Sequence, residues 1–357
     1  MFARLSALVL FASCLAHAES EPAEPPPERV PPTSATIWYA HDPTAMDRFT
    51  ENPSVSRRMV DQVIKAATNE TDIGRAWRKL VSPKDKIGIK VNAAGGRNFA
   101  TRLGVVRAII DGLEQAGVNS KNVIVWDRDL GELREAGFES KRLGAQVRGI
   151  DPPRGWDRTA PFAAPSLGKL IWGDLLFVER NKKIPGKPNS ESDQLSSTSH
   201  FSKIVTKDVT KIINVPTLTD ELGCGVAGAF YNIGVRNLDN WRRFVGSGMS
   251  AADSIPEIYD DPNIGPKVVI HILDGLVAQY AGGPEGNPNY AFPHSTIYAS
   301  TDPVAIDAVA ARNIDAWRKM AKLPPIARRL EWLSVAEQMG IGVADSNRIS
   351  LVAVTPP

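Results

Sequence analysis

Cysteine is nearly absent from this sequence. Among its 357 residues there are two cysteines, Cys14 and Cys224. A cysteine-ligated iron–sulfur cluster needs about four thiolates, so we expect no such cluster within one chain. Cys14 lies in the N-terminal apolar run, and cleavage after that run would leave one cysteine and no intramolecular disulfide. The stability of the folded chain must then come from a large apolar core.

The sequence also lacks an excess of one charge and a long apolar run. Its 42 basic and 40 acidic residues give a formal net charge of +2, and no block of like charge indicates nucleic-acid binding. Beyond the N-terminus, no run approaches the roughly 18 apolar residues of a transmembrane helix, so we expect no integral membrane span. The sequence has no HxH, HExxH or GxSxG motif, so signatures of zinc sites and hydrolases are missing. The loops Ala93–Asn98 and Gly282-Gly283-Pro284 fit neither the P-loop nor the dinucleotide fingerprint GxGxxG.

The N-terminus has the pattern of an export signal. One basic residue, Arg4, precedes the apolar run Leu5–Leu15, which is too short to span a bilayer. Ala16-His17-Ala18 is a small-x-small cleavage signature. We therefore predict a signal peptide over residues 1–18 and a periplasmic or secreted protein. The alternative is a lipoprotein, because the residues before Cys14 resemble a lipidation box; both interpretations export the chain.

Residues 19–35 are rich in Pro and Glu and indicate a disordered tether. From residue 36 apolar runs alternate with amphipathic segments. Lys86–Val91 predicts a strand, a helix begins at Thr101, and Asn122–Trp126 predicts the next strand, which together form a βαβ unit. We predict a single α/β domain over residues 36–357, with a mainly parallel open sheet and helices on both faces.

The stretch from His271 to Asp307 carries polar residues at the expected ends of its elements. An apolar run ends at Asp274, a loop follows at Gly282 and Gly283, and Asp302 opens a helix. Ligand sites of open α/β sheets gather at such ends, so these four residues are predicted to bind a ligand. Their structural alternatives are turns for Asp274 and the glycines, and a helix N-cap for Asp302.

Two residues of this stretch are candidates for catalysis. Asp307 is the only charged residue between Pro303 and Ala311, and a carboxylate on an apolar helix must be paired or hydrogen-bonded when buried. It is either held by backbone N–H groups or acts as a metal ligand or a base. His294 precedes a strand and is the best acid–base candidate; the alternative is a surface histidine.

A positive crevice is predicted from Lys90 and Asn92 at the end of an early strand. A lysine there suits a carboxylate or phosphate, and a surface lysine is the alternative. Further positive charge near this crevice is expected from Arg97, Arg236, Arg242 and Arg243, although the segment Trp241–Phe244 more simply forms a helix with a solvated face. Asp127 follows a strand in the same way as Asp274.

Four segments together resemble the domain of unknown function 362 family. They are Lys86–Asn92, Ile212–Pro216 with Gly225–Gly234, Asp274 with Gly282-Gly283-Pro284 and Ser300–Asp307, and Ala336–Ile341 with Arg348–Val352. The resemblance implies an α/β fold and little about chemistry. Some members of the family carry ferredoxin-type cysteine modules, which this chain lacks.

The central segment departs from the family pattern. Thr219-Asp220-Glu221 stands where the family commonly has Lys-Thr-His, and Tyr231-Asn232 stands where it has Lys-Asn. Two lysines and a histidine are therefore missing, and Asn232 is retained. The resemblance then implies an altered or lost activity, with Asn232 as a ligand-binding candidate.

The sequence is compatible with three functions. The first is an exported enzyme of unknown reaction, in which Lys90, Asn92 and Asn232 hold a small anionic or carbonyl ligand, His294 or Asp307 moves protons, and a divalent metal ion is the candidate cofactor. The second is an exported protein that binds the same ligand or a metal without turnover, which the missing lysines and histidine favour. A pure interaction module ranks lowest, because it has no use for buried carboxylates.

Overall fold

The computed structural model describes residues 29–151, 154–163, 198–246 and 254–354. The predicted signal peptide and most of the predicted tether lie outside the described residues. The sequence also predicts a strand at Asp174–Val178 and a long polar excursion at Asn181–Ser202, and the strand and most of the excursion lie outside them as well. Residues Pro31–Pro357 form one compact unit. Among the described residues, none of the helices has the length and apolar character needed to cross a membrane.

A ten-stranded sheet forms the centre of this unit, and eight strands follow the order β14-β1-β13-β12-β9-β4-β5-β6. Strands β12, β9, β4, β5 and β6 run parallel, whereas β13 is antiparallel to both β12 and β1. The bounds are β1 (Ala35–His41), β4 (Ile87–Val91), β5 (Val123–Trp126), β6 (Gln146–Arg148), β9 (Lys211–Val215), β12 (Val268–Gln279), β13 (Ala291–Ser300) and β14 (Ile349–Ala353), with β10 (Thr217–Glu221) and β11 (Gly225–Val226) beside β12. The sheet is mixed and mostly parallel, which confirms the predicted α/β class.

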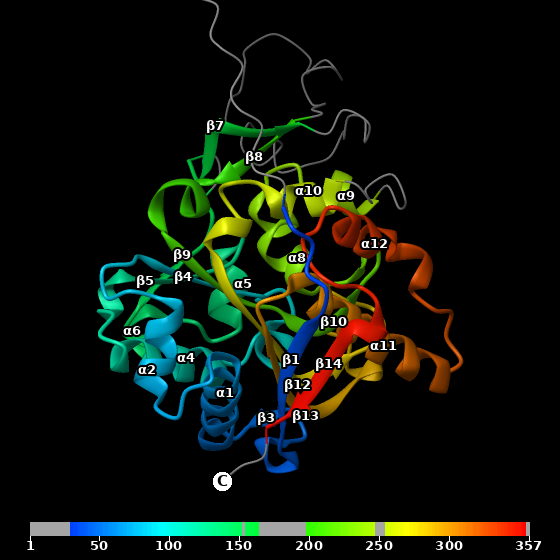
Figure 1. Cartoon of the computed structure of the whole chain (residues 1–357), viewed down its shortest axis with the longest axis horizontal. Helices are drawn as coiled ribbons and strands as arrows, with labels where there is room; N and C mark the ends of the chain where they lie inside the picture. Colours follow the sequence, from blue (N-terminus) through cyan, green and yellow to red (C-terminus); the bar gives the residue numbers. More distant parts are fainter. Residues whose placement is uncertain (1–28, 152–153, 164–197, 247–253, 355–357) are drawn as a thin grey trace, which may run out of the picture. The chain divides into compact units, whose positions relative to one another are not determined.

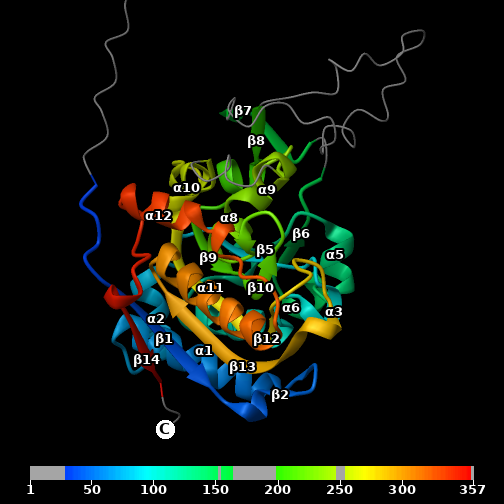
Figure 2. The ribbon, with the colours of Figure 1, turned by 90° about the vertical axis from the view of Figure 1, so that its right-hand side faces the viewer.

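Helices cover both faces of the sheet (Figures 1 and 2). One face carries α1 (Pro53–Thr68), α2 (Ile73–Leu80) and α4 (Leu103–Gln115), and the other carries α8 (Ala229–Ile233), α10 (Ser254–Asp260), α11 (Pro303–Met320) and α12 (Glu331–Gln338). Neighbouring strand residues belong to different cores: Ile212 packs with the second group of helices and Ile213 with the first. This alternation is what a strand buried on both faces requires.

The shorter elements are β2 (Met46–Asp47), β3 (Thr50–Glu51), α3 (Gly96–Phe99), α5 (Leu130–Glu135), α6 (Ser140–Leu143), β7 (Trp156–Ala163), β8 (Thr198–Ser202) and α9 (Arg242–Gly246). Strands β7 and β8 pair with each other in a separate ribbon, which lies at the top of the molecule in Figure 1.

Two elements differ from their predicted extents. The sequence places a strand end at Asp274, but β12 continues to Gln279, because its second half pairs with β13 after a register shift between Gly275 and Val277. The glycine-rich segment Gly225–Gly234, for which the family resemblance implies a helix, is helical only from Ala229 to Ile233. Gly225 has φ +87° and belongs to β11 instead.

The sheet has a topological switch between β4 and β9. From β4 the chain continues to β5 and β6 on one side, whereas from β9, the neighbour of β4 on its other side, it continues to β10 and β12. Ligand sites of such sheets lie outside the carboxyl ends of the strands near this point.

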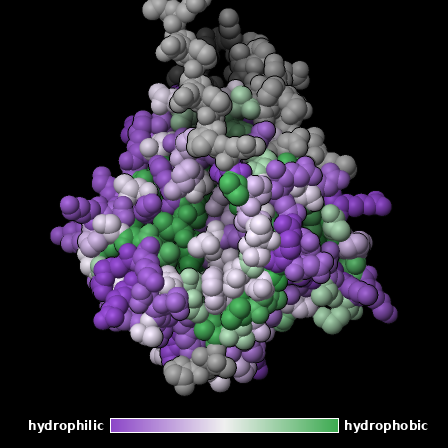
Figure 3. Space-filling view, in the orientation of Figure 1, coloured by the Kyte–Doolittle hydropathy of each residue, from purple (hydrophilic) through white to green (hydrophobic). Residues whose placement is uncertain are grey.

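Strand β14 forms the edge of the sheet farthest from β6. Its residues Leu351 and Val352 are 49% and 42% exposed, and Figure 3 shows apolar surface in that region.

Candidate functional site

Lys90 on β4 is completely buried and uses all three of its donors. Its Nζ donates to Asp127 Oδ1 at 2.7 Å, to Val91 O at 2.8 Å and to Asn232 Oδ1 at 3.0 Å. Burial lowers the pKa of Lys90 to about 8, against the opposing influence of Asp127. An external anion would have to break these bonds, so the Lys90 ammonium supports the interior of the site instead of facing a ligand.

Asp127 fixes the loops that follow β4 and β5. Its Oδ1 accepts from Lys90 and from the Arg128 backbone N–H at 2.7 Å, and its Oδ2 accepts from the Ala93 backbone N–H at 2.7 Å. Arg236 Nη2 lies 3.5 Å from the same Oδ2. Burial opposes ionisation of this carboxyl, but Lys90 and Arg236 hold the pKa of Asp127 well below its usual range.

A chain of buried hydrogen bonds continues from Lys90 across the sheet. Asn232 Nδ2 donates to Asn214 Oδ1 at 2.8 Å, and Asn214 Nδ2 donates to His271 Nδ1 at 3.0 Å. His271 Nε2 must then carry the ring proton, and it lies 3.0 Å from Tyr259 Oη. Burial lowers the pKa of His271 to about 3, so the ring is neutral.

This chain lies at the switch point. Lys90 on β4 is in register with Asn214 on β9, and all five residues of α8, which carries Asn232, are buried above them. The structure therefore brings the predicted residues Lys90 and Asn232 together. Lys90, Asn214 and Asn232 are all buried.

Asn92 and Asp274 both lie next to Thr217, the first residue of β10. Asn92 Nδ2 donates to Thr217 Oγ1 at 2.7 Å, and Thr217 is the register partner of Asp274. Asp274 Oδ2 accepts the Arg102 backbone N–H at 2.6 Å, and its Oδ1 accepts the Leu276 backbone N–H at 3.0 Å. Burial raises the pKa of Asp274. Both side chains hold backbone segments, including the start of α4.

The predicted glycines and Asp302 have structural contacts. Gly282 has φ +85°, a conformation that other residues rarely adopt. The Gly283 backbone N–H donates to Asp220 Oδ1 at 2.9 Å, and a Cβ on Gly283 would lie 2.1 Å from the Asp220 carbonyl oxygen. Asp302 is the N-cap of α11 and accepts the Ala305 backbone N–H at 2.8 Å. A ligand role for these residues remains a prediction.

Asp307 is fully buried and binds the start of α8. Its two oxygens accept the backbone N–H groups of Ala229 at 2.6 Å and Phe230 at 3.1 Å. A Cβ on Gly228 would lie 2.0 Å from Asp307 Oδ1, so glycine is needed for this close approach. Burial raises the pKa of Asp307 to about 7. The geometry agrees with the structural alternative, in which backbone N–H groups hold the carboxyl.

His294 lies in a separate aromatic cluster. Its Nε2 lies 2.8 Å from Tyr298 Oη, and its ring centroid lies 5.1 Å from that of Trp317 and 6.1 Å from that of Phe292. Burial lowers the pKa of His294 to about 4. In the described part of the chain it has no contact with Lys90 or Asn232, and its catalytic role remains a prediction.

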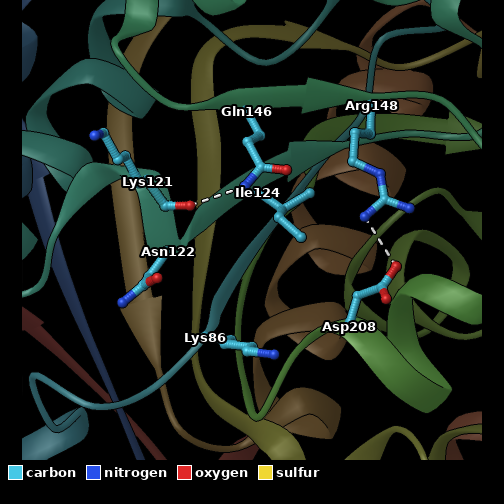
Figure 4. A pocket seen from close by; sticks show the side chains of 7 residues that line it. All are labelled: Lys86, Lys121, Asn122, Ile124, Gln146, Arg148 and Asp208. Carbon is cyan, nitrogen blue, oxygen red and sulfur yellow. Dashed lines mark hydrogen bonds and ion pairs between the residues drawn. The ribbon is translucent and has the colours of Figure 1, made fainter.

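A small pocket of about 190 Å³ lies at the amino ends of β4 and β5 (Figure 4). Figure 4 shows Arg148 and Asp208 pointing toward each other across it, and their ion pair measures 2.8 Å. Gln146 Nε2 donates to the Lys121 carbonyl oxygen at 2.8 Å. Ligand sites of α/β sheets usually lie at the carboxyl ends of the strands, the opposite edge from this pocket. The charges of Arg148 and Asp208 also neutralise each other already.

A larger cleft of about 840 Å³ lies at the carboxyl ends of β4, β5 and β6. Its walls come from the loop after β4, from the start of α5, from the loop after β6, and from the segment that follows α8. The lining residues are Ala94, Arg128, Asp129, Leu130, Gly131, Glu132, Gly149, Ile150, Asp151, Trp156, Arg236, Trp241, Arg242 and Glu285. This is the sheet edge at which ligand sites of the fold class occur.

Three arginines gather around one indole in this cleft. The guanidinium carbons of Arg128, Arg236 and Arg242 each lie 5.6 Å from the Trp241 ring centroid, and that of Arg128 also lies 4.9 Å from the Trp156 centroid. Burial lowers the pKa of Arg128 to about 9, and Arg236 acts in the same direction. Four carboxylates, Asp129, Glu132, Asp151 and Glu285, line the same cleft, so the arginines form a local cluster within a lining of mixed charge.

The cleft carries charges of both signs at each depth. Arg236 is 5% exposed and pairs with the half-buried Glu132 at 3.0 Å. Arg242 is exposed, as are the acidic residues Asp129, Asp151 and Glu285. A ligand that enters the cleft therefore meets exposed carboxylates and one exposed guanidinium before it reaches Arg128 and Arg236.

Sequence reasoning found part of this site. The sequence indicates Arg236, Arg242 and Asp127 as candidate site residues, but it does not single out Arg128 or Trp156. The position just after a parallel strand, where ligand sites gather, is the signal that could have indicated both residues. Arg128 lies two residues after β5, and the loop after β6 leads to Trp156.

Fold and cleft together define an α/β protein with a ligand-sized cleft at the carboxyl edge of its parallel strands. Residues 178–312 match the model of the family described as Domain of unknown function (DUF362). The match confirms the resemblance to this family over the central and late segments.

No curated protein matches the chain. A crystal structure of a protein from Thermotoga maritima, solved by the Northeast Structural Genomics Consortium, is similar with a TM-score of 0.40 and 9% sequence identity. The similarity covers 75% of this chain and 60% of that protein. In the described ranges, no group of three or more His, Cys, Asp or Glu side chains could hold a metal ion.

Proposed function

We propose that the cleft binds a small organic anion with an aromatic or apolar body. The observation that carries the proposal is the convergence of three guanidinium groups on Trp241, each at 5.6 Å from its ring centroid. Guanidinium groups match carboxylate and phosphate geometry, and they stack on aromatic rings. The charge of Arg236 disfavours the charged form of Arg128, so a bound anion would relieve the repulsion between these two groups.

The walls of the cleft suit the remainder of such a ligand. Leu130, Ile150, Trp156 and Trp241 supply apolar surface beside the arginines. A volume of about 840 Å³ lies within the roughly 300–1,000 Å³ of typical small-molecule sites. An inorganic anion lacks an apolar body and gains nothing from these walls, so we expect it to bind more weakly than an aromatic anion.

Ligand binding, without an assigned reaction, is the function that these contacts support. Both oxygens of Asp307 are used by backbone N–H groups, and His294 belongs to another cluster. The segment Thr219–Glu221, which replaces the family's Lys-Thr-His, is buried. The enzyme interpretation, the divalent metal ion and export remain predictions.

Calorimetric titration of the purified chain tests the proposal. The ligands are benzoate and phenyl phosphate, with benzyl alcohol as the uncharged match and inorganic phosphate as the anion without a ring. We expect one of the aromatic anions to bind more tightly than both controls, and its affinity to fall with rising salt.

Two arginine variants provide the matched comparison. Arg242→Gln removes an exposed cleft cation, and we expect about tenfold weaker binding, or about 1.4 kcal/mol. Arg134→Gln removes an exposed arginine of α5 that does not line the cleft, and it should leave the affinity unchanged. Equal affinity for the anion and its uncharged match, or equal loss in both variants, contradicts the proposal.

A further inference from the structure

Glu132 on α5 forms an ion pair with Arg236 inside the cleft. Both residues line the cleft, and Glu132 Oε2 lies 3.0 Å from Arg236 Nη2. The Glu132 side chain is 38% exposed, whereas that of Arg236 is 7% exposed. A carboxylate that reaches solvent therefore contacts a guanidinium that scarcely does.

The pair uses only part of the hydrogen-bonding capacity of Arg236. A guanidinium has several N–H donors, and a carboxylate that matches it fully forms two parallel bonds. Glu132 and Asp127 both approach the same nitrogen, Nη2, at 3.0 and 3.5 Å. Among the described residues, Nη1 and Nε of Arg236 form no hydrogen bond. An anion that bonds two of these nitrogens therefore gains more than Glu132 does.

Asp127 and Glu132 differ in how firmly they are held. Asp127 is completely buried and also accepts from Lys90 and from two backbone N–H groups. In the described part of the chain, the Glu132 carboxylate has Arg236 as its one hydrogen-bond partner. A partly exposed ion pair of this kind contributes little to stability, so the Glu132 carboxylate can leave Arg236 at low cost.

We propose that Glu132 is an internal competitor for the anion site: its carboxylate occupies Arg236, and an anionic ligand must displace it. The inference rests on the proposed function and adds the group that regulates access to that site. The alternative is a purely structural ion pair, which attaches α5 to the segment after α8. The two roles differ in outcome, because a purely structural pair would not weaken anion binding.

Protonation of Glu132 removes the competitor. Burial raises the pKa of its carboxyl, Asp127 and Asp129 act in the same direction, and Arg236 opposes them. Neutral Glu132 no longer competes as an anion for Arg236, so the affinity for an anionic ligand rises as pH falls through this pKa. The charged groups around Glu132 are Asp129 at the start of its own helix, Asp127 and Arg128 after β5, Arg236 after α8, Lys90 on β4, and Arg97 on α3, which packs against α5.

Titration of the variant Glu132→Gln tests the competition, because glutamine keeps the shape of the side chain and removes its charge. At pH 7 we expect the variant to bind the tightest of benzoate, phenyl phosphate and benzenesulfonate about fivefold more tightly than the unmodified chain. The control Glu135→Gln removes an exposed carboxylate of the same helix that does not line the cleft. Its affinity should match that of the unmodified chain.

A second titration compares pH 7 with pH 5.5 and uses benzoate or benzenesulfonate, which both stay charged over this range. The affinity of the unmodified chain should rise as pH falls, and that of Glu132→Gln should rise less. The other carboxylates of the cleft act alike in both proteins, so the difference reports on Glu132.

The outcomes separate this inference from the proposed function. If an aromatic anion binds the unmodified chain and Glu132→Gln binds it no more tightly, the competing role of Glu132 is refuted and the binding proposal stands. The same holds if both proteins show the same pH dependence. If no aromatic anion binds either protein, the binding proposal fails as well.

Discussion

Replacing Asp127 with asparagine removes the charge that neutralises Lys90 and keeps the shape of the side chain. The two side chains are 0% exposed and their ion pair measures 2.7 Å. Breaking a buried ion pair by removing one member costs about 3–5 kcal/mol. Asp127 also accepts from Ala93 and Arg128 backbone N–H groups, so we expect a loss of that size in the free energy of unfolding at pH 7.

In the variant, the Lys90 charge has lost its partner. The stability lost to this unpaired charge cannot exceed the free energy needed to deprotonate Lys90. A lysine with an unfolded pKa of about 10.4 costs about 4.6 kcal/mol to neutralise at pH 7 and about 2 kcal/mol at pH 9. In the variant the folded pKa of Lys90 falls below its present value of about 8. The folded state then binds fewer protons than the unfolded state, so the stability of the variant rises with pH over this window.

Urea unfolding at pH 7 and pH 9 measures both effects. The control is Glu70→Gln, which breaks the partly exposed ion pair with Lys79 at 3.0 Å and should cost less than about 1 kcal/mol. The reasoning is refuted if Asp127→Asn loses no more stability than the control. It is also refuted if the loss grows from pH 7 to pH 9.

Two further predictions concern a buried carboxyl and the N-terminus. Burial raises the folded pKa of Asp307 to about 7, so its contribution to stability is complete below about pH 4 and is lost as pH rises to 7, by at most about 4 kcal/mol. Asp307→Asn should flatten this part of the stability–pH curve in urea unfolding at pH 4, 5.5 and 7, and an unchanged slope would contradict the assignment. Mass spectrometry of the chain recovered from an exporting bacterial host should show an N-terminus at Glu19; a lipid-modified Cys14 would favour the alternative, and an intact Met1 would exclude both.

The fold class followed from the sequence because buried parallel strands leave apolar runs that alternate with amphipathic helices. The strand end at Asp274 was wrong for a physical reason: β12 continues to Gln279 by pairing with β13, and this pairing depends on residues later in the chain. Hydropathy along one segment cannot show such a partner.

The candidate site was predicted only in part, for a related reason. The apolar surroundings of Asp307 indicated a buried charge, but its binding groups, Ala229 and Phe230, are 78 and 77 positions away. Lys90 was expected to face a ligand, whereas Asp127 and Asn232 enclose it. The arginines of the cleft become a group only when the loops after β5 and α8 meet.

The buried chain from Lys90 to Tyr259 couples the choice of residues at distant positions. Asn232 offers its oxygen to Lys90 and its nitrogen to Asn214, and Asn214 repeats this polarity toward His271. A change of one member leaves the next with an unpaired donor or acceptor, which costs about 1–3 kcal/mol when buried. Viable sequences of this fold should therefore change these positions in adjacent pairs, and a relative that lacks Lys90 should also differ at Asp127 or Asn232.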